Sequence, residues 1–159
     1  MKICIIYDTF YGNTQKVAEL YKGNLAEFHP SLLKVDVVTQ EVIDAYDIIL
    51  FGAPTRAFNM TKKMKKVLKK YKYQNKYFMA FDTRARIEDV NSKLLTKLAN
   101  RFGYAAEKIE SRLIRKEALK LMDYTFYFVK DTEGPLFEEM ETRLKKDVTE
   151  LIKKIRNLS

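Results

Sequence analysis

The sequence has no tryptophan, one cysteine, three prolines and five glycines among its 159 residues. The single cysteine, Cys4, excludes an intrachain disulfide, and its place in the apolar run 3–6 favours a buried, unreactive thiol. No stretch approaches the ~20 apolar residues of a membrane span, and the first residues lack the pattern of a secretory signal. We therefore expect one soluble, cytoplasmic domain over residues 1–159, with no membrane partner and no need of a disulfide or metal to fold.

Acidic residues are too few to balance the basic ones. The chain has 30 Lys and Arg against 21 Asp and Glu, a formal charge of +9, and the positive excess lies in residues 61–159. Eight lysines fall within 61–77, interleaved with Tyr71, Tyr73 and Tyr77. Lysines among aromatic residues can bind nucleic acid. The apolar positions of this segment keep helical spacing, so we favour a solvated helix face over a nucleic-acid partner.

Buried strands and amphipathic helices alternate along the chain. Short apolar runs predict strands at residues 2–7, 33–38, 47–51, 77–81, 109–114 and 124–129. Apolar residues at helical spacing predict helices over 14–25, 61–71, 88–102 and 137–155, and we interpret 117–122 as one helical turn. This alternation is typical of the α/β class, in which helices cover both faces of a parallel sheet.

The loop between the first predicted strand and the first predicted helix, residues 7–14, reads YDTFYGNT. Thr9 and Thr14 offer hydroxyls, Asn13 offers an amide, and Gly12 permits a tight turn close to a ligand. The helix that follows directs free N–H groups and its positive dipole end at the loop. The lysine of nucleoside triphosphate loops is absent, so the loop suits a phosphate monoester better. An ordinary turn capped by Thr14 is the alternative interpretation.

The same residues resemble the N-terminal signature of flavodoxins, here Ile5-Ile6-Tyr7-x-Thr9-x-x-Gly12-x-Thr14-x-x-x-Ala18. The resemblance implies a doubly wound, flavodoxin-like fold with a five-stranded parallel sheet of order 2-1-3-4-5 and helices on both faces. It also implies non-covalent FMN, with the phosphate held by the loop Thr9–Thr14. The loop includes Phe10 and also Tyr11, whose bulk departs from the small hydroxyl residue usual in the family but leaves its backbone N–H available.

Two further segments resemble the flavodoxin loops that hold the flavin ring. They are 47–59, DIILFGAPTRAFN, and 81–84, FDTR, and the likeness continues at 102–107 and 133–136. Phe58 is the residue expected to stack on the ring, and Arg56 or Arg84 the one expected to stabilise negative charge on it. The resemblance thus implies ring contacts from Pro54, Thr55, Arg56, Ala57, Phe58, Asn59, Asp82, Thr83 and Arg84.

Two positions depart from the flavodoxin pattern. Many flavodoxins cover the outer face of the ring with a tyrosine from the fourth-strand loop, but no aromatic residue lies between Asp82 and Leu94. This implies a ring that is half open or covered by a partner. The glycine at which a peptide flips in short flavodoxins is also missing, and Asn59 is the residue of that loop that best tolerates a positive φ.

Three functions stay open at this point. The first is an FMN-binding electron-transfer protein, since no constellation of catalytic side chains is visible. The second is an FMN-dependent NAD(P)H or quinone oxidoreductase on the same fold, as a monomer or dimer, because fold does not fix function. The third is a non-redox module that binds an acidic partner or nucleic acid through the lysine-rich segment 61–77. Carrier flavodoxins are commonly acidic and dock on basic proteins, so this basic chain implies a redox partner protein with an acidic docking surface.

Overall fold

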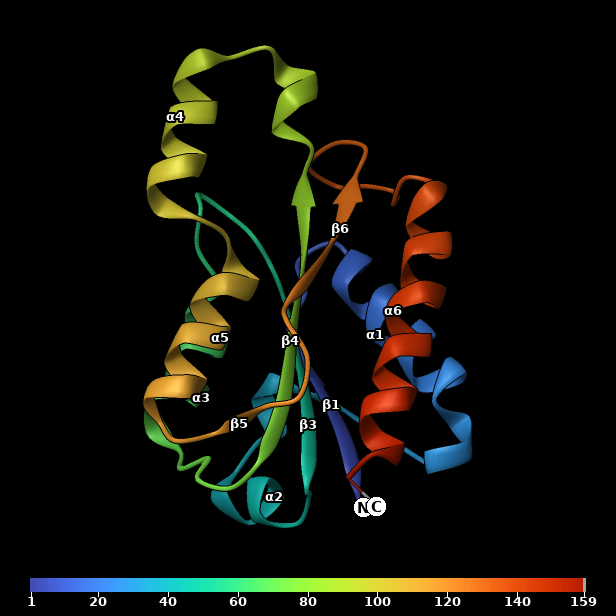
Figure 1. The fold of residues 1–159 in the computed structure, drawn as a ribbon. Helices are drawn as coiled ribbons and strands as arrows, with labels where there is room; N and C mark the ends of the chain where they lie inside the picture. The colour runs from blue at the N-terminus through green and yellow to red at the C-terminus, as the bar shows by residue number, and fades with distance from the viewer. Residues whose placement is uncertain (159) are drawn as a thin grey trace.

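A parallel sheet runs through the middle of the computed structural model, which describes residues 1–158 (Figure 1). The strands are β1 (Ile3–Tyr7), β2 (Ser31–Lys34), β3 (Ile48–Pro54), β4 (Tyr77–Ala85), β5 (Leu119–Lys120) and β6 (Thr125–Val129). The helices are α1 (Asn13–Asn24), α2 (Gln40–Asp44), α3 (Lys62–Lys70), α4 (Lys93–Phe102), α5 (Ala105–Arg115) and α6 (Glu139–Arg156). Short 3₁₀ turns occupy Ala26–Phe28, Val35–Val37 and Ile87–Val90.

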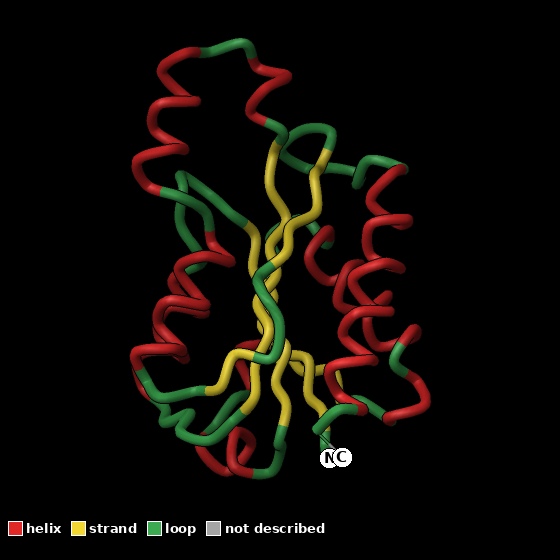
Figure 2. Tube along the Cα trace, viewed as in Figure 1, coloured by secondary structure: helices red, strands yellow, loops and turns green. Residues whose placement is uncertain are grey.

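The order of the sheet is β2-β1-β3-β4-β5, and every pairing between these strands is parallel. This confirms the predicted doubly wound order 2-1-3-4-5. The fifth position is shared by two strands, because β5 pairs with Tyr77 and Phe78 at the start of β4, and β6 pairs with residues 81–85 at its end. The chain leaves the sheet briefly between them, as the tube in Figure 2 shows.

Helices cover both faces of the sheet, with α1 and α6 on one side and α3 and α5 on the other (Figure 1). Successive residues of a strand point to opposite faces. Ile5 accordingly joins the core beneath α1 and α6, whereas its neighbour Ile6 joins the core beneath α3 and α5. Both faces of β1 are fully buried, which explains the continuous apolar run that predicts this strand.

The predicted strand at 109–114 is wrong, because these residues form the second half of α5. Ala105, Ile109 and Leu113 recur every four residues and face the sheet, and the carboxylate of Glu107 accepts a hydrogen bond from the N–H of Tyr104 at 2.9 Å at the start of the helix. The segment 117–122 contains β5 rather than a helical turn.

Two other boundaries differ from the sequence prediction. The second strand ends at Lys34, and residues 35–37 form a 3₁₀ turn instead of continuing it. The predicted helix over 88–102 begins only at Lys93, where the hydroxyl of Ser92 accepts the N–H of Leu95 at 3.3 Å. The turn 87–90 and α4 together form an arm that extends beyond the carboxyl end of β4 (Figure 1). In residues 1–158, no helix combines the length and the apolar composition needed to cross a membrane.

Candidate functional site

A hollow of about 270 Å³ opens at the carboxyl ends of β1, β3, β4 and β6. Here the chain leaves β1 for β2 on one side and returns to β3 on the other, which makes it the point where the strand order reverses. Ligands of doubly wound sheets bind at such a point. The hollow is lined by Thr9, Phe10, Tyr11, Asn13, Thr14, Pro54, Thr55, Arg56, Ala57, Thr83, Arg84, Ala85, Val129, Asp131 and Thr132.

The floor of the hollow is the loop between β1 and α1. Gly12 has φ +88°, and a Cβ built on it would meet no atom within 4 Å, so the loop needs glycine for its backbone conformation and not for space. The hydroxyl of Thr9 accepts the N–H of Gly12 at 2.9 Å, and the buried carboxylate of Asp8 accepts the N–H of Thr9 at the same distance. These two bonds hold the loop in a tight curve.

The first turn of α1 keeps its backbone donors free. Gly12 occupies the N-cap position and supplies no side chain to cap the helix. The first helical bond runs from the N–H of Lys16 to the carbonyl of Gly12, so within residues 1–158 the N–H groups of residues 13–15 have no protein acceptor. Free N–H groups at the positive end of a helix are a favourable site for an anion.

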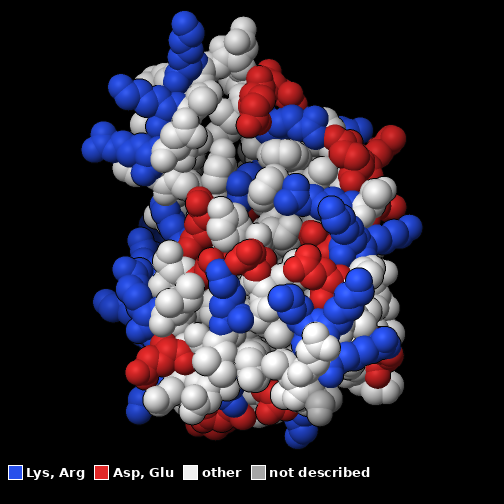
Figure 3. Space-filling model, viewed as in Figure 1, with Lys and Arg blue, Asp and Glu red and all other residues white. Residues whose placement is uncertain are grey.

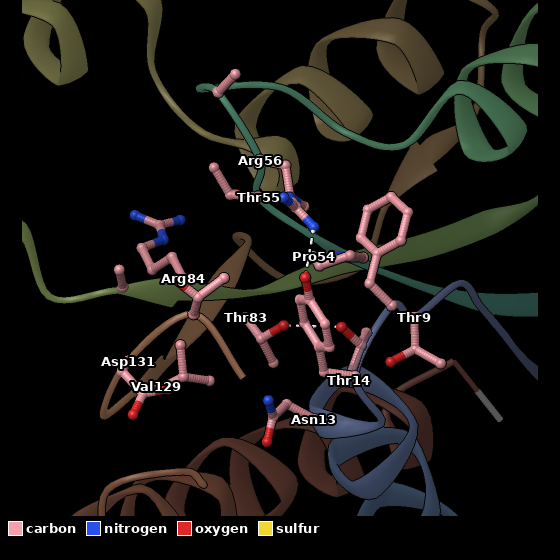
Figure 4. A pocket seen from close by; sticks show the side chains of 15 residues that line it. Thr9, Asn13, Thr14, Pro54, Thr55, Arg56, Thr83, Arg84, Val129 and Asp131 are labelled. Atoms are coloured by element: carbon pink, nitrogen blue, oxygen red, sulfur yellow. Dashed lines mark hydrogen bonds between the residues drawn. The ribbon is translucent and has the colours of Figure 1, made fainter. Parts of the chain in front are cut away.

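A buried pair of hydroxyls links this loop to β4. Oγ1 of Thr14 lies 2.7 Å from Oγ1 of Thr83, and both side chains are buried (Figure 4). The amide of Asn13 is held from the other side, where its Nδ2 donates to the carbonyl of Glu133 at 2.8 Å. The loop is therefore braced from two directions before any ligand binds, which lowers the entropic cost of binding.

Arg56 faces the loop from the end of β3. Its Nη1 donates to the hydroxyl of Tyr11 at 3.2 Å, which the dashed line in Figure 4 marks, and its guanidinium lies 5.0 Å from the ring centre of Phe10. All three side chains are exposed. Together they form the outer rim of the hollow and bring a positive charge to it.

Arg84 is positioned differently from Arg56. Its Nε and Nη2 donate to the two carboxylate oxygens of Asp82 at 2.7 and 2.6 Å, and the guanidinium lies between the rings of Tyr104 and Phe126, at 3.7 and 4.2 Å from their centres. Asp82 is 0% exposed and also accepts the N–H of Ala106 at 2.9 Å. Burial raises the pKa of the Asp82 carboxyl, and the Arg84 guanidinium opposes that rise.

These contacts distinguish the side chains of the segment after β3 and of β4 that reach the hollow from those that do not. Asp82 is enclosed beneath Arg84 and does not line the hollow, so its side chain is not available to a ring there. Arg84 does line the hollow, but a carboxylate already pairs with its charge. Arg56 is therefore the better candidate of the two arginines for stabilising negative charge on a ligand.

Residues 56–59 form a tight two-residue turn. Arg56 and Asn59 exchange both backbone hydrogen bonds at 2.9 Å, and the two residues between them, Ala57 and Phe58, have φ +46° and +58°. This is the geometry of a type I′ turn, which favours asparagine or glycine at both central positions. The positive φ values thus fall at Ala57 and Phe58, whereas the sequence suggested Asn59. The side chain of Asn59 instead accepts the N–H of Met60 at 3.0 Å.

Phe58 lies beside the hollow and does not line it. The turn directs it out of the hollow and into an adjoining apolar cleft, where its ring meets that of Tyr104 edge-on with the centres 6.5 Å apart. This cleft, of about 250 Å³, is lined by Thr55, Ala57, Phe58, Arg84, Ala85, Ile87, Val90, Leu95 and Tyr104. The cleft and the hollow share Thr55, Ala57, Arg84 and Ala85, so the two form one continuous depression.

Several site residues have no signal in the local sequence. Val129 lines the hollow from the end of β6, and Asp131 and Thr132 line it from the loop between β6 and α6. This loop packs against the first one: a Cβ added to Gly134, whose φ is +94°, would lie 2.3 Å from the amide oxygen of Asn13. Tyr104 places an aromatic ring in the adjoining cleft, to which the loop after β4 contributes none. The resemblance at 102–107 includes Tyr104, and the resemblance at 133–136 lies next to Asp131 and Thr132 without including them.

Comparison with known proteins agrees with the fold. A model of the family described as "Flavodoxin domain" matches residues 4–109. Flavodoxin 2 from Bacillus cereus superimposes with a TM-score of 0.77 at 21% identity, covering 97% of this chain and 99% of that chain. Flavodoxin 1 of the same organism gives 0.74 at 16% identity over 96% and 98%. A flavodoxin from Fusobacterium nucleatum, solved bound to flavin mononucleotide, gives 0.67 at 13% identity over 98% and 97%. No curated protein sequence matches significantly.

Proposed function

This chain belongs to the flavodoxin domain family, and on that premise we propose that it binds FMN and transfers electrons. The observation that carries the proposal is the uncapped start of α1, whose free N–H groups open into the hollow at the β1/β3 reversal. Flavodoxins are a standard example of doubly wound proteins that bind FMN at this point. Bound FMN would supply reversible one- and two-electron chemistry.

The residues of the loop fit a phosphate monoester. The donors are neutral, namely the N–H groups of residues 13–15, the hydroxyl of Thr9 and the amide of Asn13, and the helix adds its positive end. Thr14 has a different part, because its hydroxyl is engaged with that of Thr83 and fixes the position of the turn. A set of neutral donors around a helix terminus suits a dianion better than a triphosphate.

The adjoining cleft fits the flat part of a flavin. Aromatic and aliphatic side chains from three segments line it, namely Phe58, Tyr104 and the apolar residues of the arm, Ile87, Val90 and Leu95. A ring that lies along the shared wall would contact backbone at Thr55, Ala57 and Ala85 and be near the charge of Arg56. The residues that would hold the ring thus come from the segments after β3 and β4.

The test is a titration of the purified protein with FMN and, in parallel, with riboflavin, which lacks the phosphate. Flavin fluorescence and the visible absorption spectrum report binding. We expect quenching on binding and an affinity for FMN about tenfold or more above that for riboflavin, because the phosphate contacts supply at least 1.4 kcal/mol. Equal affinities would contradict the role of the loop, and the absence of binding to either flavin would overturn the proposal.

A second candidate is an FMN-dependent oxidoreductase that acts on NAD(P)H or a quinone. The observation in its favour is that the apolar cleft opens at the arm, where Val90 is 54% exposed, so a small flat substrate could reach it. Anaerobic mixing of the FMN-loaded protein with NADPH separates the two. Flavin bleaching within seconds in the absence of any other protein favours the enzyme, and no bleaching favours the electron-transfer protein.

A further inference from the structure

Two helices on one face of the sheet, α3 and α5, carry a dense group of cations. In nine residues, α3 has six lysines and no acidic residue. Arginines and a lysine of α5 extend the group across the face, and basic side chains project along this edge of the molecule in profile (Figure 3). We define the basic surface as Lys62, Lys63, Lys65, Lys66, Lys69, Lys70, Lys108, Arg112 and Arg115.

Little of this charge is neutralised within the protein. Over the described residues, the basic surface has one ion pair, between Lys63 and Asp36 at 2.8 Å. Of the two glutamates of α5, Glu107 accepts the N–H of Tyr104 and partly offsets the lowering of the Lys108 pKa. Glu110 accepts the N–H of Tyr124 and pairs with Lys120 at 3.5 Å, outside the basic surface. On the opposite face, α6 mixes six basic residues with four acidic ones. The charge is therefore concentrated on one side of the molecule.

The basic surface reaches the edge of the proposed flavin site. A hollow of about 420 Å³ between the two helices is lined by Asn59, Lys65, Lys108, Ser111, Arg112 and Arg115. The ammonium of Lys108 donates to the carbonyl of Phe58, in the turn that separates this hollow from the apolar cleft. Burial and the nearby Lys65 ammonium lower the pKa of Lys108. A carboxylate that entered the hollow would relieve this repulsion.

The aromatic residues of the lysine-rich segment 61–77 argue against nucleic acid as the partner of the basic surface. Tyr73 is 1% exposed, and its hydroxyl donates to the carbonyl of Val67 at 2.9 Å. Tyr71 is half-buried, and its hydroxyl donates to the carbonyl of Val38 at 2.9 Å. Single-stranded nucleic acids bind to exposed aromatic rings on which bases stack. These rings face inward, so the basic surface offers charge without a stacking platform.

We propose that the basic surface is the docking site for an acidic protein, whose carboxylates enter the hollow between α3 and α5 while its redox centre lies next to the turn at Phe58. This inference rests on the proposed function, because it names the partner of the same site. Charge complementarity selects the partner, and the adjacency of the hollow and the cleft brings the two redox centres close.

The experiment measures binding of the FMN-loaded protein to a plant-type [2Fe–2S] ferredoxin, a soluble acidic redox protein, by titration calorimetry at low and high salt. The test variant is Lys65→Glu with Arg115→Glu, which reverses two exposed charges at the hollow. The control, Lys145→Glu with Lys146→Glu, makes the same charge change at exposed positions of α6. A second test variant, Lys65→Arg with Arg115→Lys, keeps both positive charges and changes only the shape of each side chain. Circular dichroism checks that each variant folds.

We expect the wild type and the charge-keeping variant to bind ferredoxin at low salt, and the charge-reversed variant to bind about tenfold or more weakly. The α6 control variant should lose much less affinity for ferredoxin. Three results would overturn the inference: no complex with the wild type, equal losses in the test and control pairs, or tighter binding of a labelled single-stranded DNA than of ferredoxin. FMN affinity is measured in the same samples, so the failure of flavin binding is distinguished from the failure of docking.

Discussion

The hydroxyls of Thr14 and Thr83 lie 2.7 Å apart and tie the first turn of α1 to the end of β4 beneath the candidate site. The pair joins two segments that are 69 residues apart in the sequence. It fixes the position of the proposed phosphate loop relative to the strand that carries Arg84. Its loss should therefore alter both stability and the site.

This bond can be measured with a double-mutant cycle. Either Thr14→Val or Thr83→Val leaves one buried hydroxyl without a partner and should lower the free energy of unfolding by about 1–3 kcal/mol. The double variant should cost less than the sum of the two, by about 1 kcal/mol, because neither hydroxyl remains. Urea denaturation followed by circular dichroism gives the four values. Strict additivity would mean that the two hydroxyls do not interact.

The role of Thr9 at the proposed phosphate site can be tested with two ligands. Thr9→Val removes the hydroxyl that accepts the N–H of Gly12 and that would face the phosphate. We expect FMN to bind about tenfold more weakly, a change of about 1.4 kcal/mol, and riboflavin to bind as before. Fluorescence titration measures both affinities. A parallel loss of riboflavin binding would show that the variant disturbs the ring site instead.

The loop between β6 and α6 packs against the loop between β1 and α1. Alanine should therefore have opposite effects on stability at Gly134, which lies in this contact, and at Gly23, which lies in α1. Gly134→Ala would place a Cβ 2.3 Å from Asn13 at a positive φ, and should lower the free energy of unfolding by about 1–3 kcal/mol. Gly23→Ala adds a methyl group to α1 with no atom within 4 Å, and should raise stability by about 0.5–1 kcal/mol. Thermal unfolding distinguishes the two, and a stable Gly134→Ala protein would contradict the described contact.

Ala57 has a backbone conformation that an alanine disfavours. Its φ of +46° costs about 1–2 kcal/mol relative to glycine, so Ala57→Gly should raise the free energy of unfolding by about 1 kcal/mol. The control is Ala45→Gly, at a residue with φ −72°, which should lower stability slightly because glycine loses more entropy on folding. Chemical denaturation measures both. A destabilised Ala57→Gly variant would argue against the type I′ turn.

The buried thiol of Cys4 predicts a pH dependence. Burial raises its pKa from 9.0 to about 12, so above pH 9 the unfolded chain loses this proton while the folded protein keeps it. Stability is therefore fully present below pH 9 and falls as the pH rises toward 12. Between pH 8 and pH 9.5 the wild type should lose about 1 kcal/mol more than Cys4→Ala, which lacks the thiol. Parallel slopes for the two proteins would show that the thiol is accessible.

The sequence predicts those parts of the fold in which local pattern and tertiary position agree. β1 and β3 are buried on both faces, so each reads as a continuous apolar run. Residues 109–114 mislead because Ile109, Leu113 and Ile114 suit a strand as well as a helix. Ala105, Ala106 and Glu107 are the residues that identify the helix start, and they lie before the run that we interpreted.

The site residues also divide into those that the local sequence predicts and those that depend on tertiary contacts. The loop 9–14 is local, and the sequence places it correctly at the end of β1. The direction of Phe58 depends on two positive φ values in a turn of residues that seldom adopt them, which composition does not reveal. The contribution of Asp131 and Thr132 depends on how α6 packs against α1, a contact between opposite ends of the chain. The family resemblance at 133–136 lies next to these residues but does not include them.

The split of the last sheet position into β5 and β6 has a consequence for self-association. The outer edge of a sheet presents unpaired N–H and C=O groups on which a strand of another molecule can add. Here β5 has only two residues, and part of the outer edge of β6 is closed by its own chain. The N–H of Lys130 donates to the carbonyl of Pro135 at 2.9 Å, and the N–H of Phe137 donates to the carbonyl of Phe128 at 3.1 Å. The segment that helps to build the site therefore also shields part of this edge of the sheet from pairing with another molecule.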